Sequence, residues 1–112
     1  MKPERATELL AGERARVEEA LQSIEAGGPL EGSASREPGD RGSEDLYLDE
    51  LNASRAESLR AELAAVERAE ARLAAGTYGL SVDSGDPIPD ERLEAIPTAE
   101  RTVAEQQRYE RS

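Results

Sequence analysis

The sequence predicts an all-α protein in which two long helices pair as an antiparallel helical hairpin, followed by a small C-terminal cap and a terminal helix. The first observation is composition, because the strong helix formers Ala, Leu, Glu and Arg are abundant among the 112 residues. The second is a shortage of large apolar groups, since Phe and Trp are absent and aromatic residues make up 3% of the chain. Such a chain lacks the apolar surface for a broad globular core. A narrow seam of Leu and Ala between helices suits it better.

The first helix is predicted from about Pro3 to Ala26. Proline is tolerated in the first turn of a helix, and the acidic Glu4 suits the positive end of its dipole. Large apolar residues then recur at spacings of seven, four and three, the a/d pattern of a helix that lies along another: Leu10, Val17, Leu21 and Ile24. The sequence Gly-Gly-Pro at 27–29 ends this helix.

A loop and a second long helix follow. Residues 27–43 are rich in Gly, Pro and Ser and poor in apolar groups, which predicts a loop. The second helix is predicted to begin after Ser43, as its N-cap, and to run to about Ala75, with Gly76 at the C′ position. Glu70 occupies one position of its seam. The apolar residues of the seam are Leu48, Leu51, Leu59, Leu63, Val66 and Leu73.

Residues 76–112 are predicted to form the cap and the terminal helix. Turn-forming residues are concentrated from Ser81 to Pro89, a short helical turn spans residues 90–96, and a terminal helix runs from Thr98 to Tyr109. We expect the apolar residues of the cap to pack together, with Tyr78 at the junction to the helices. These residues are Leu80, Val82, Ile88, Leu93, Ile96 and Val103.

The net charge of −11 limits the classes of partner. Acidic residues exceed basic ones in both long helices and in the cap, so the surface repels nucleic-acid phosphates and anionic lipid headgroups. Direct DNA binding and membrane binding are therefore not expected, and a partner with a basic channel fits better. The alternative is that the charge only keeps a small helical protein soluble. No apolar stretch is long enough for a membrane span or a signal peptide, so a cytoplasmic location is expected.

Enzymatic activity is not expected. The chain has neither His nor Cys, so no nucleophile–base pair of the usual kinds is available. Adjacent carboxylates such as Glu18 and Glu19 point about 100° apart on a helix and do not share a pocket.

The C-terminal third of the chain carries an ordered motif. Residues 76–80 read Gly-Thr-Tyr-Gly-Leu, residues 85–89 read Gly-Asp-Pro-Ile-Pro, and residues 91–99 read Glu-Arg-Leu-Glu-Ala-Ile-Pro-Thr-Ala. This order resembles the C-terminal signature of the TraR/DksA family, G-x-Y-G-x-C-x-x-C-G-x-x-I-x-x-x-R-L-x-A-x-P-x-A-x-x-C-x-x-C. Every element of that pattern other than cysteine is present at the right spacing. The long helix, loop and long helix that precede it also resemble the coiled coil of the family.

The resemblance divides the chain into a coiled-coil hairpin over residues 1–75 and a zinc-finger-like module over residues 76–112. The module departs from the family because all four cysteine positions are substituted, by Ser81, Ser84, Thr102 and Glu105. Structural zinc prefers four Cys or His ligands, so no zinc site and no other cofactor are predicted. Ordinary packing must hold the cap, and the hydroxyls of Ser81 and Ser84 are expected to bond to turn amides.

The resemblance also implies a function, namely regulation of transcription by binding RNA polymerase through its secondary channel. In the family, two acidic residues at the tip of the coiled coil act near the catalytic centre. The corresponding residues here are Glu37 and Asp40, in the sequence Glu-Pro-Gly-Asp-Arg-Gly at 37–42. The alternative at this position is an acidic, solvated loop. The alternative function is a fold relative without zinc that acts as a non-catalytic protein-interaction module.

Overall fold

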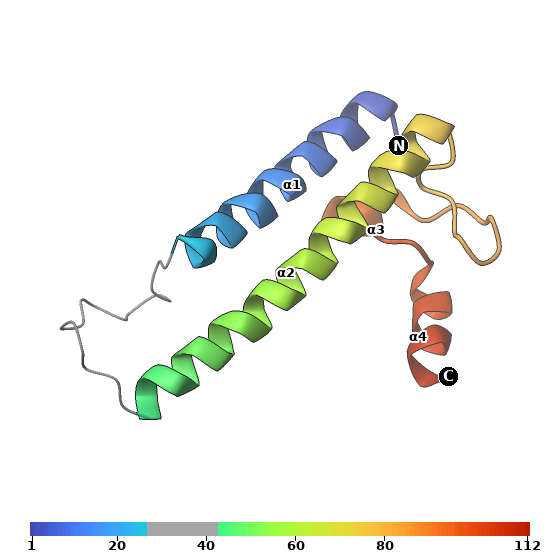
Figure 1. Cartoon of the computed structure of the whole chain (residues 1–112). Helices are drawn as coiled ribbons and strands as arrows, with labels where there is room; N and C mark the ends of the chain where they lie inside the picture. The colour runs from blue at the N-terminus through green and yellow to red at the C-terminus, as the bar shows by residue number, and fades with distance from the viewer. Residues whose placement is uncertain (27–42) are drawn as a thin grey trace. The chain divides into compact units, whose positions relative to one another are not determined.

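The computed structural model describes residues 1–26 and 43–112, and this part of the chain consists of helices, turns and one isolated antiparallel bridge between Leu80 and Pro87. Within these residues, four helices follow one another (Figure 1): α1 (Pro3–Glu25), α2 (Ser43–Ala75), α3 (Asp90–Ala95) and α4 (Val103–Arg111). The all-α prediction is confirmed, and so is the hairpin of α1 and α2. No helix among these residues is both long and apolar enough to cross a membrane.

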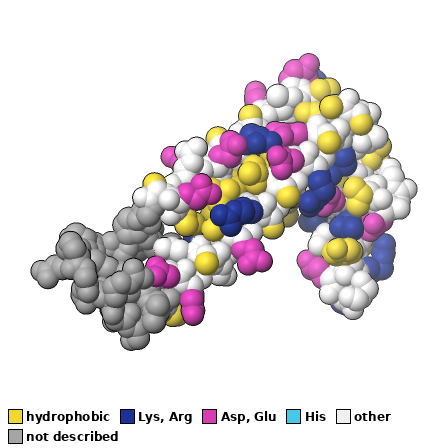
Figure 2. Space-filling view, viewed as in Figure 1, with side chains coloured by type: hydrophobic (Ala, Val, Ile, Leu, Met, Phe, Trp, Pro, Cys, Tyr) yellow, Lys and Arg dark blue, Asp and Glu magenta, His cyan; other side chains and the backbone are white. Residues whose placement is uncertain are grey.

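The chain divides into two compact units, Met1–Arg14 with Ala64–Ser112 and Ala15–Leu63. Both α1 and α2 contribute residues to each unit. Figure 2 shows acidic and basic side chains interspersed over one face, with hydrophobic side chains between them.

In the unit Ala15–Leu63, α1 and α2 pack through a seam of small and branched side chains. The buried cluster comprises Val17, Leu21, Ala56 and Leu59, and three further residues pack against it: Ala20, Ile24 and Leu63. The ion pair Arg16 Nη2–Glu62 Oε1, at 2.8 Å, joins the two helices beside the seam. The periodicity of the sequence therefore predicted most of this seam.

The placement of Leu51 in the seam was wrong, because 42% of this residue is exposed. Counting back from Leu59 by seven residues reaches Asn52, which is half-buried and carries a buried Oδ1 atom. Leu51 is one residue off that register, and one residue turns a side chain by about 100° around a helix. The α2 seam therefore continues through a polar residue at this level.

In the other unit, four residues of α1 and α2 are buried: Ala6, Leu10, Val66 and Ala69. Glu70 lies at the next seam position, and its charge is matched by Arg14. The guanidinium of Arg14 donates hydrogen bonds to both carboxylate oxygens, with Nη2–Oε1 at 2.6 Å and Nε–Oε2 at 3.0 Å. The hydrogen bonds and the charge of Arg14 lower the pKa of the Glu70 carboxyl, despite its partial desolvation. An interhelical ion pair thus accommodates the acidic residue in the seam.

The end of α2 begins the C-terminal module with a Schellman-type turn. Gly76 has φ +81°, its amide donates to the Leu73 carbonyl at 3.2 Å, and the Thr77 amide donates to the Arg72 carbonyl at 2.9 Å. Gly76 therefore occupies the predicted C′ position. A narrow loop follows, and two backbone hydrogen bonds close it. The Ser81 amide donates to the Asp86 carbonyl at 2.8 Å, and the Ile88 amide donates to the Gly79 carbonyl at 2.7 Å.

The core of the module is small. Ile88, Leu93 and Ala99 form its buried cluster, and Tyr78 packs against them while its hydroxyl donates to the Pro97 carbonyl at 2.8 Å. Desolvation raises the pKa of the Tyr78 phenol. The start of α1 also contacts this module, because Arg5 donates to both oxygens of Glu94, at 2.9 and 2.7 Å.

The prediction that six apolar residues fill the cap was wrong for four of them. Leu80, Val82, Ile96 and Val103 are 39% to 52% exposed. Leu80 and Val82 flank Ser81, and alternate residues of an extended segment face opposite sides, so the burial of Ser81 turns both neighbours outward. The terminal helix also begins later than predicted, at Val103 and not at Thr98.

Candidate functional site

The first part of the candidate site is the loop after α2, which carries Ser81 and Ser84. Ser81 is 5% exposed. Its Oγ accepts hydrogen bonds from the amides of Asp83 at 3.1 Å and Ser84 at 3.3 Å. The Ser84 Oγ in turn accepts from the Asp86 amide at 3.1 Å. The two serine hydroxyls therefore bond to turn amides, as the sequence predicted.

The second part is the start of α4, which a capping box defines. Thr102 is the N-cap, and its Oγ1 accepts a hydrogen bond from the Glu105 amide at 3.3 Å. The Glu105 side chain reaches back, and its Oε1 accepts from the Thr102 amide at 2.9 Å. Reciprocal bonds of this kind satisfy two of the amides that a helix start leaves without a partner.

These two parts meet at the Glu105 carboxylate, which is buried with 7% of the residue exposed. Hydrogen bonds from the Ser84 hydroxyl, which contributes most, from the Thr102 amide and from the Ser81 hydroxyl lower the pKa of Glu105 to about 2. We call Ser81, Ser84, Thr102 and Glu105 the polar cluster. The structure thus brings together all four residues that stand at the cysteine positions of the motif.

A second group of charges connects the module to α2. Glu100 accepts hydrogen bonds from Arg68 Nε at 3.1 Å and Arg72 Nη1 at 3.0 Å. Burial alone would raise the pKa of Glu100, but the hydrogen bond from Arg68 and the charges of Arg68, Arg72 and Arg101 outweigh it and lower the pKa. The backbone carbonyl of Glu100 also accepts from the Val82 amide at 2.8 Å. Glu100 therefore links the module to α2 and to the loop that holds Ser81.

Arg101 extends this connection on the other side. Its Nε donates to Asp83 Oδ2 at 2.8 Å, and its guanidinium carbon lies 3.9 Å from the centre of the Tyr109 ring. The Arg101 carbonyl accepts from Arg92 Nε at 2.9 Å. Arg101 thereby contacts the loop, α3 and α4. Neither Glu100 nor Arg101 was predicted from the sequence, because their partners lie many residues away and no local pattern marks such pairs.

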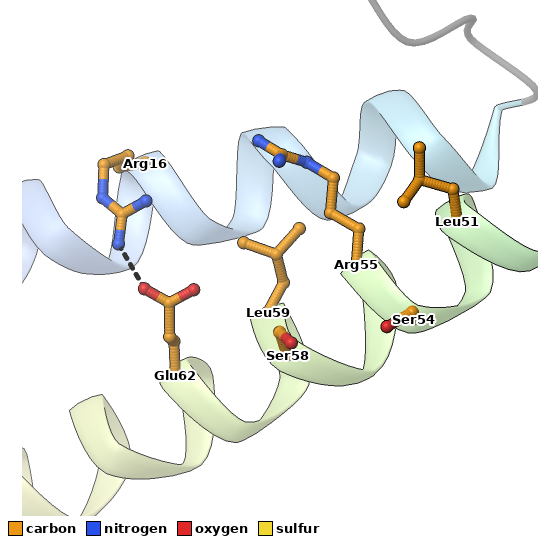
Figure 3. A pocket seen from close by; sticks show the side chains of 7 residues that line it. All are labelled: Arg16, Leu51, Ser54, Arg55, Ser58, Leu59 and Glu62. Atoms are coloured by element: carbon orange, nitrogen blue, oxygen red, sulfur yellow. Dashed lines mark hydrogen bonds and ion pairs between the residues drawn. The ribbon is translucent and has the colours of Figure 1, made fainter. Parts of the chain in front are cut away.

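A groove of about 350 Å³ lies on the unit Ala15–Leu63. Figure 3 shows Leu51 and Leu59 beside two arginines, Arg16 and Arg55, with the Arg16–Glu62 ion pair at one end. Ser54 and Ser58 complete its lining. The carboxylate in the groove bonds to Arg16, and no histidine or cysteine exists in the chain to act as a base or nucleophile. The groove therefore presents two leucines bordered by charged and hydroxyl side chains.

The predicted tip residues Glu37 and Asp40 lie outside the residues that the structure describes. Their role remains a prediction. Among the described residues, no group of three or more acidic side chains is arranged to hold a metal ion.

Comparison with known proteins connects these features to a family. Residues 76–111 match the family model described as prokaryotic dksA/traR C4-type zinc finger. The chain is also similar to general stress protein 16O of Bacillus subtilis (strain 168), with 33% identity over 98 residues, which make up 87% of this chain and 57% of that protein. The chain thus spans less than two thirds of the length of this relative.

Two solved structures are also similar. The transcription factor DksA2 from Pseudomonas aeruginosa aligns with a TM-score of 0.69 and 25% identity, over 97% of this chain and 83% of that chain. The RNA polymerase binding protein and transcriptional regulator Dks from Chlamydia trachomatis L2 (LGV434) aligns with a TM-score of 0.45 and 23% identity, over 93% and 90% of the two chains. The first likeness includes the hairpin and the module.

The family model implies a zinc ion held by four cysteines, and the residues of this chain do not fit that ion. Three hydroxyls and one carboxylate stand at the four positions, whereas structural zinc prefers thiolates and imidazoles. The hydroxyl oxygens already accept bonds from backbone amides, and the carboxylate already accepts bonds from the hydroxyls and an amide. The polar cluster is therefore complete in itself.

Proposed function

Since this chain belongs to the DksA/TraR family, we propose that it regulates transcription by binding RNA polymerase, with the α1–α2 hairpin entering the secondary channel of the enzyme. The observation behind the proposal is the likeness of nearly the whole chain to DksA2, a transcription factor. If the likeness were confined to the module, it would not support a role for the α1–α2 hairpin.

Two features of the chain support this role. A hairpin whose buried seam is only two helices wide is narrow, which suits insertion into a channel. The net charge of −11 favours a partner surface that is basic and disfavours direct contact with nucleic acid. Association with a basic channel should be fast at low ionic strength and should weaken as salt screens the charges.

The test uses site-specific cross-linking, because the chain has no cysteine and a single introduced thiol is unique. Ser54→Cys places a thiol on α2 in the hairpin, and Gln107→Cys places one on the exposed side of α4. Each variant is labelled with a photo-cross-linker and mixed with core RNA polymerase at low salt. We expect Ser54→Cys to cross-link to the walls of the secondary channel, and Gln107→Cys to cross-link elsewhere on the enzyme.

Binding of the unlabelled chain to core polymerase is measured in parallel at low and at high salt. A chain that is helical by circular dichroism but does not bind at low salt would disprove the polymerase role and leave the alternative of a protein-interaction module with another partner. Binding without channel cross-links from Ser54→Cys would retain the partner and disprove the channel.

We further propose Glu37 and Asp40 as the acidic pair that acts near the catalytic centre of the polymerase. Only the resemblance supports this assignment. The double variant Glu37→Gln/Asp40→Asn should bind polymerase as the unmodified chain does, yet lose its effect on transcription in vitro. An unchanged effect would disprove this assignment.

A further inference from the structure

We propose that the polar cluster takes the structural place of the zinc centre, with the Glu105 carboxylate at its middle, so that the C-terminal module folds and stays folded without any metal ion. This inference concerns the construction of the module and does not depend on the proposed binding to polymerase.

The hydrogen-bonding capacity of the four side chains supports this inference. A serine hydroxyl has one proton to donate and two lone pairs that accept. The Ser81 oxygen accepts from two backbone amides and the Ser84 oxygen accepts from one, so the proton of each hydroxyl remains to be donated. An ionised carboxylate has only acceptor sites, and Glu105 takes both protons together with the Thr102 amide. Each of these protons therefore has an acceptor within the polar cluster.

The burial of the polar cluster also supports it. Ser81 and Glu105 are the two buried polar residues in the described part of the chain, at 5% and 7% exposure. A buried carboxylate without hydrogen bonds is strongly unfavourable, whereas charge-assisted bonds to it are shorter and about twice as strong as neutral ones. The site therefore needs Glu105 ionised and fully bonded. This is the state that the surrounding donors favour.

The polar cluster also connects two segments of the module. Ser81 and Ser84 lie in the loop after α2, while Thr102 and Glu105 lie at the start of α4, about twenty residues later. Bonds to Glu105 thus join the two segments, and Thr102 positions Glu105 through the capping box. A zinc ion with two ligands in each segment would make the same connection. The apolar cluster of Ile88, Leu93 and Ala99 is small, so the module depends on this connection.

The principal experiment compares the full chain with Glu105→Gln, Ser84→Ala and a control, Glu91→Gln, in thermal unfolding. Glu91 is an exposed carboxylate of α3 in the same module, so the control removes one negative charge without touching the polar cluster. We expect Glu105→Gln and Ser84→Ala to lower Tm by about 5 °C or more, and Glu91→Gln to leave it within about 1 °C. Equal values of Tm for Glu105→Gln and Glu91→Gln would overturn the central role of Glu105.

Metal dependence is tested on the unmodified chain. We expect the purified chain to contain substoichiometric zinc by elemental analysis, and its Tm to be the same with and without EDTA. A full equivalent of zinc, or a lower Tm in EDTA, would overturn the proposal. Both readouts are independent of polymerase binding, so failure here would leave the proposed function standing.

The placement of the four side chains is tested by introducing a cysteine at each of the four positions. The quadruple variant Ser81→Cys/Ser84→Cys/Thr102→Cys/Glu105→Cys should bind one equivalent of Co²⁺ and show the absorption of a tetrahedral thiolate complex, because the four positions converge on one point. Its Tm should then fall in EDTA, unlike that of the unmodified chain. A quadruple variant that is helical but binds no cobalt would contradict the convergence.

Discussion

The hairpin seam and the C-terminal module of this protein are stabilised by different forces. In the unit Ala15–Leu63, apolar side chains from two helices are buried along a seam that also includes the polar Asn52, and ion pairs flank the seam. In the module, three residues make up the buried apolar cluster, and a network of hydrogen bonds and ion pairs supplements it. A sequence with few large apolar residues can thus use a repeating helical pattern for one region, but needs long-range polar contacts for the other.

The largest expected effect is on the seam. Val17 is fully buried, so Val17→Asp places a carboxylate there without a partner and should lower the free energy of unfolding by about 4 kcal/mol. Urea unfolding followed by circular dichroism measures this change. Ala11→Asp, at an exposed position of α1, is the control and should cost less than about 1 kcal/mol. Similar losses in both variants would contradict the buried seam.

A slightly smaller effect is expected in the apolar part of the module. Leu93 is 1% exposed, and Leu93→Ala should cost about 3 kcal/mol because it leaves a cavity in a small cluster. Ile96→Ala, at a site that is nearly half exposed, should cost less than about 1 kcal/mol. Thermal unfolding of both variants checks the difference. If Ile96→Ala proved the more costly variant, Ile96 would belong to the core of the module, which would contradict its exposure in the structure.

The polar cluster should make the module sensitive to acid. The folded-state pKa of Glu105 is about 2, below its ordinary value of 4.5, so its contribution to stability is fully present above pH 4.5 and is lost as the pH falls toward 2. The Tm difference between the unmodified chain and Glu105→Gln should therefore be largest at neutral pH and shrink by pH 3. Calorimetry at several pH values tests this, and a difference that grew on acidification would contradict it.

The smallest effect is expected for the ion pair between Arg14 and Glu70. Both side chains are about one third exposed, so Arg14→Met, which keeps the apolar stem and removes the charge, should cost about 0.5–1 kcal/mol. The cost should fall at high salt because exposed charges are screened. Urea titrations at low and high salt measure it. A cost that did not change with salt would show that packing of the Arg14 stem, and not its charge, supports the seam.

The sequence predicted the helical region well because periodicity is a local property. The spacing of Leu59, Leu63 and Val66 determines which face of α2 is buried, and Gly76 marks where the helix ends. The error at Leu51 came from following residue type and not register, since the seven-residue step from Leu59 leads to the polar Asn52. Counting strictly in steps of seven residues would have identified Asn52 as the seam residue.

The cap was less predictable because its core depends on which side of a loop each residue faces. Apolar character suggested that Val82 and Ile96 would be inside, and both are exposed, while the polar Ser81 is buried. One local signal was available, since Thr102 followed by Glu105 is the sequence signature of a capping box and marks the start of α4. The partners of Glu100 and Arg101 were not predictable, because those ion pairs form only when distant segments meet.

The capping box has a further consequence for how such a module can change during evolution. A zinc-binding C-x-x-C pair and a T-x-x-E capping box share one spacing, because each brings together the side chains of residues i and i+3. In this chain the capping box lies at the start of α4. Thr102 and Glu105 fill the two positions at this spacing, and their reciprocal bonds stabilise α4 locally. Two protein chemistries with nothing else in common thus fit the same stretch of helix.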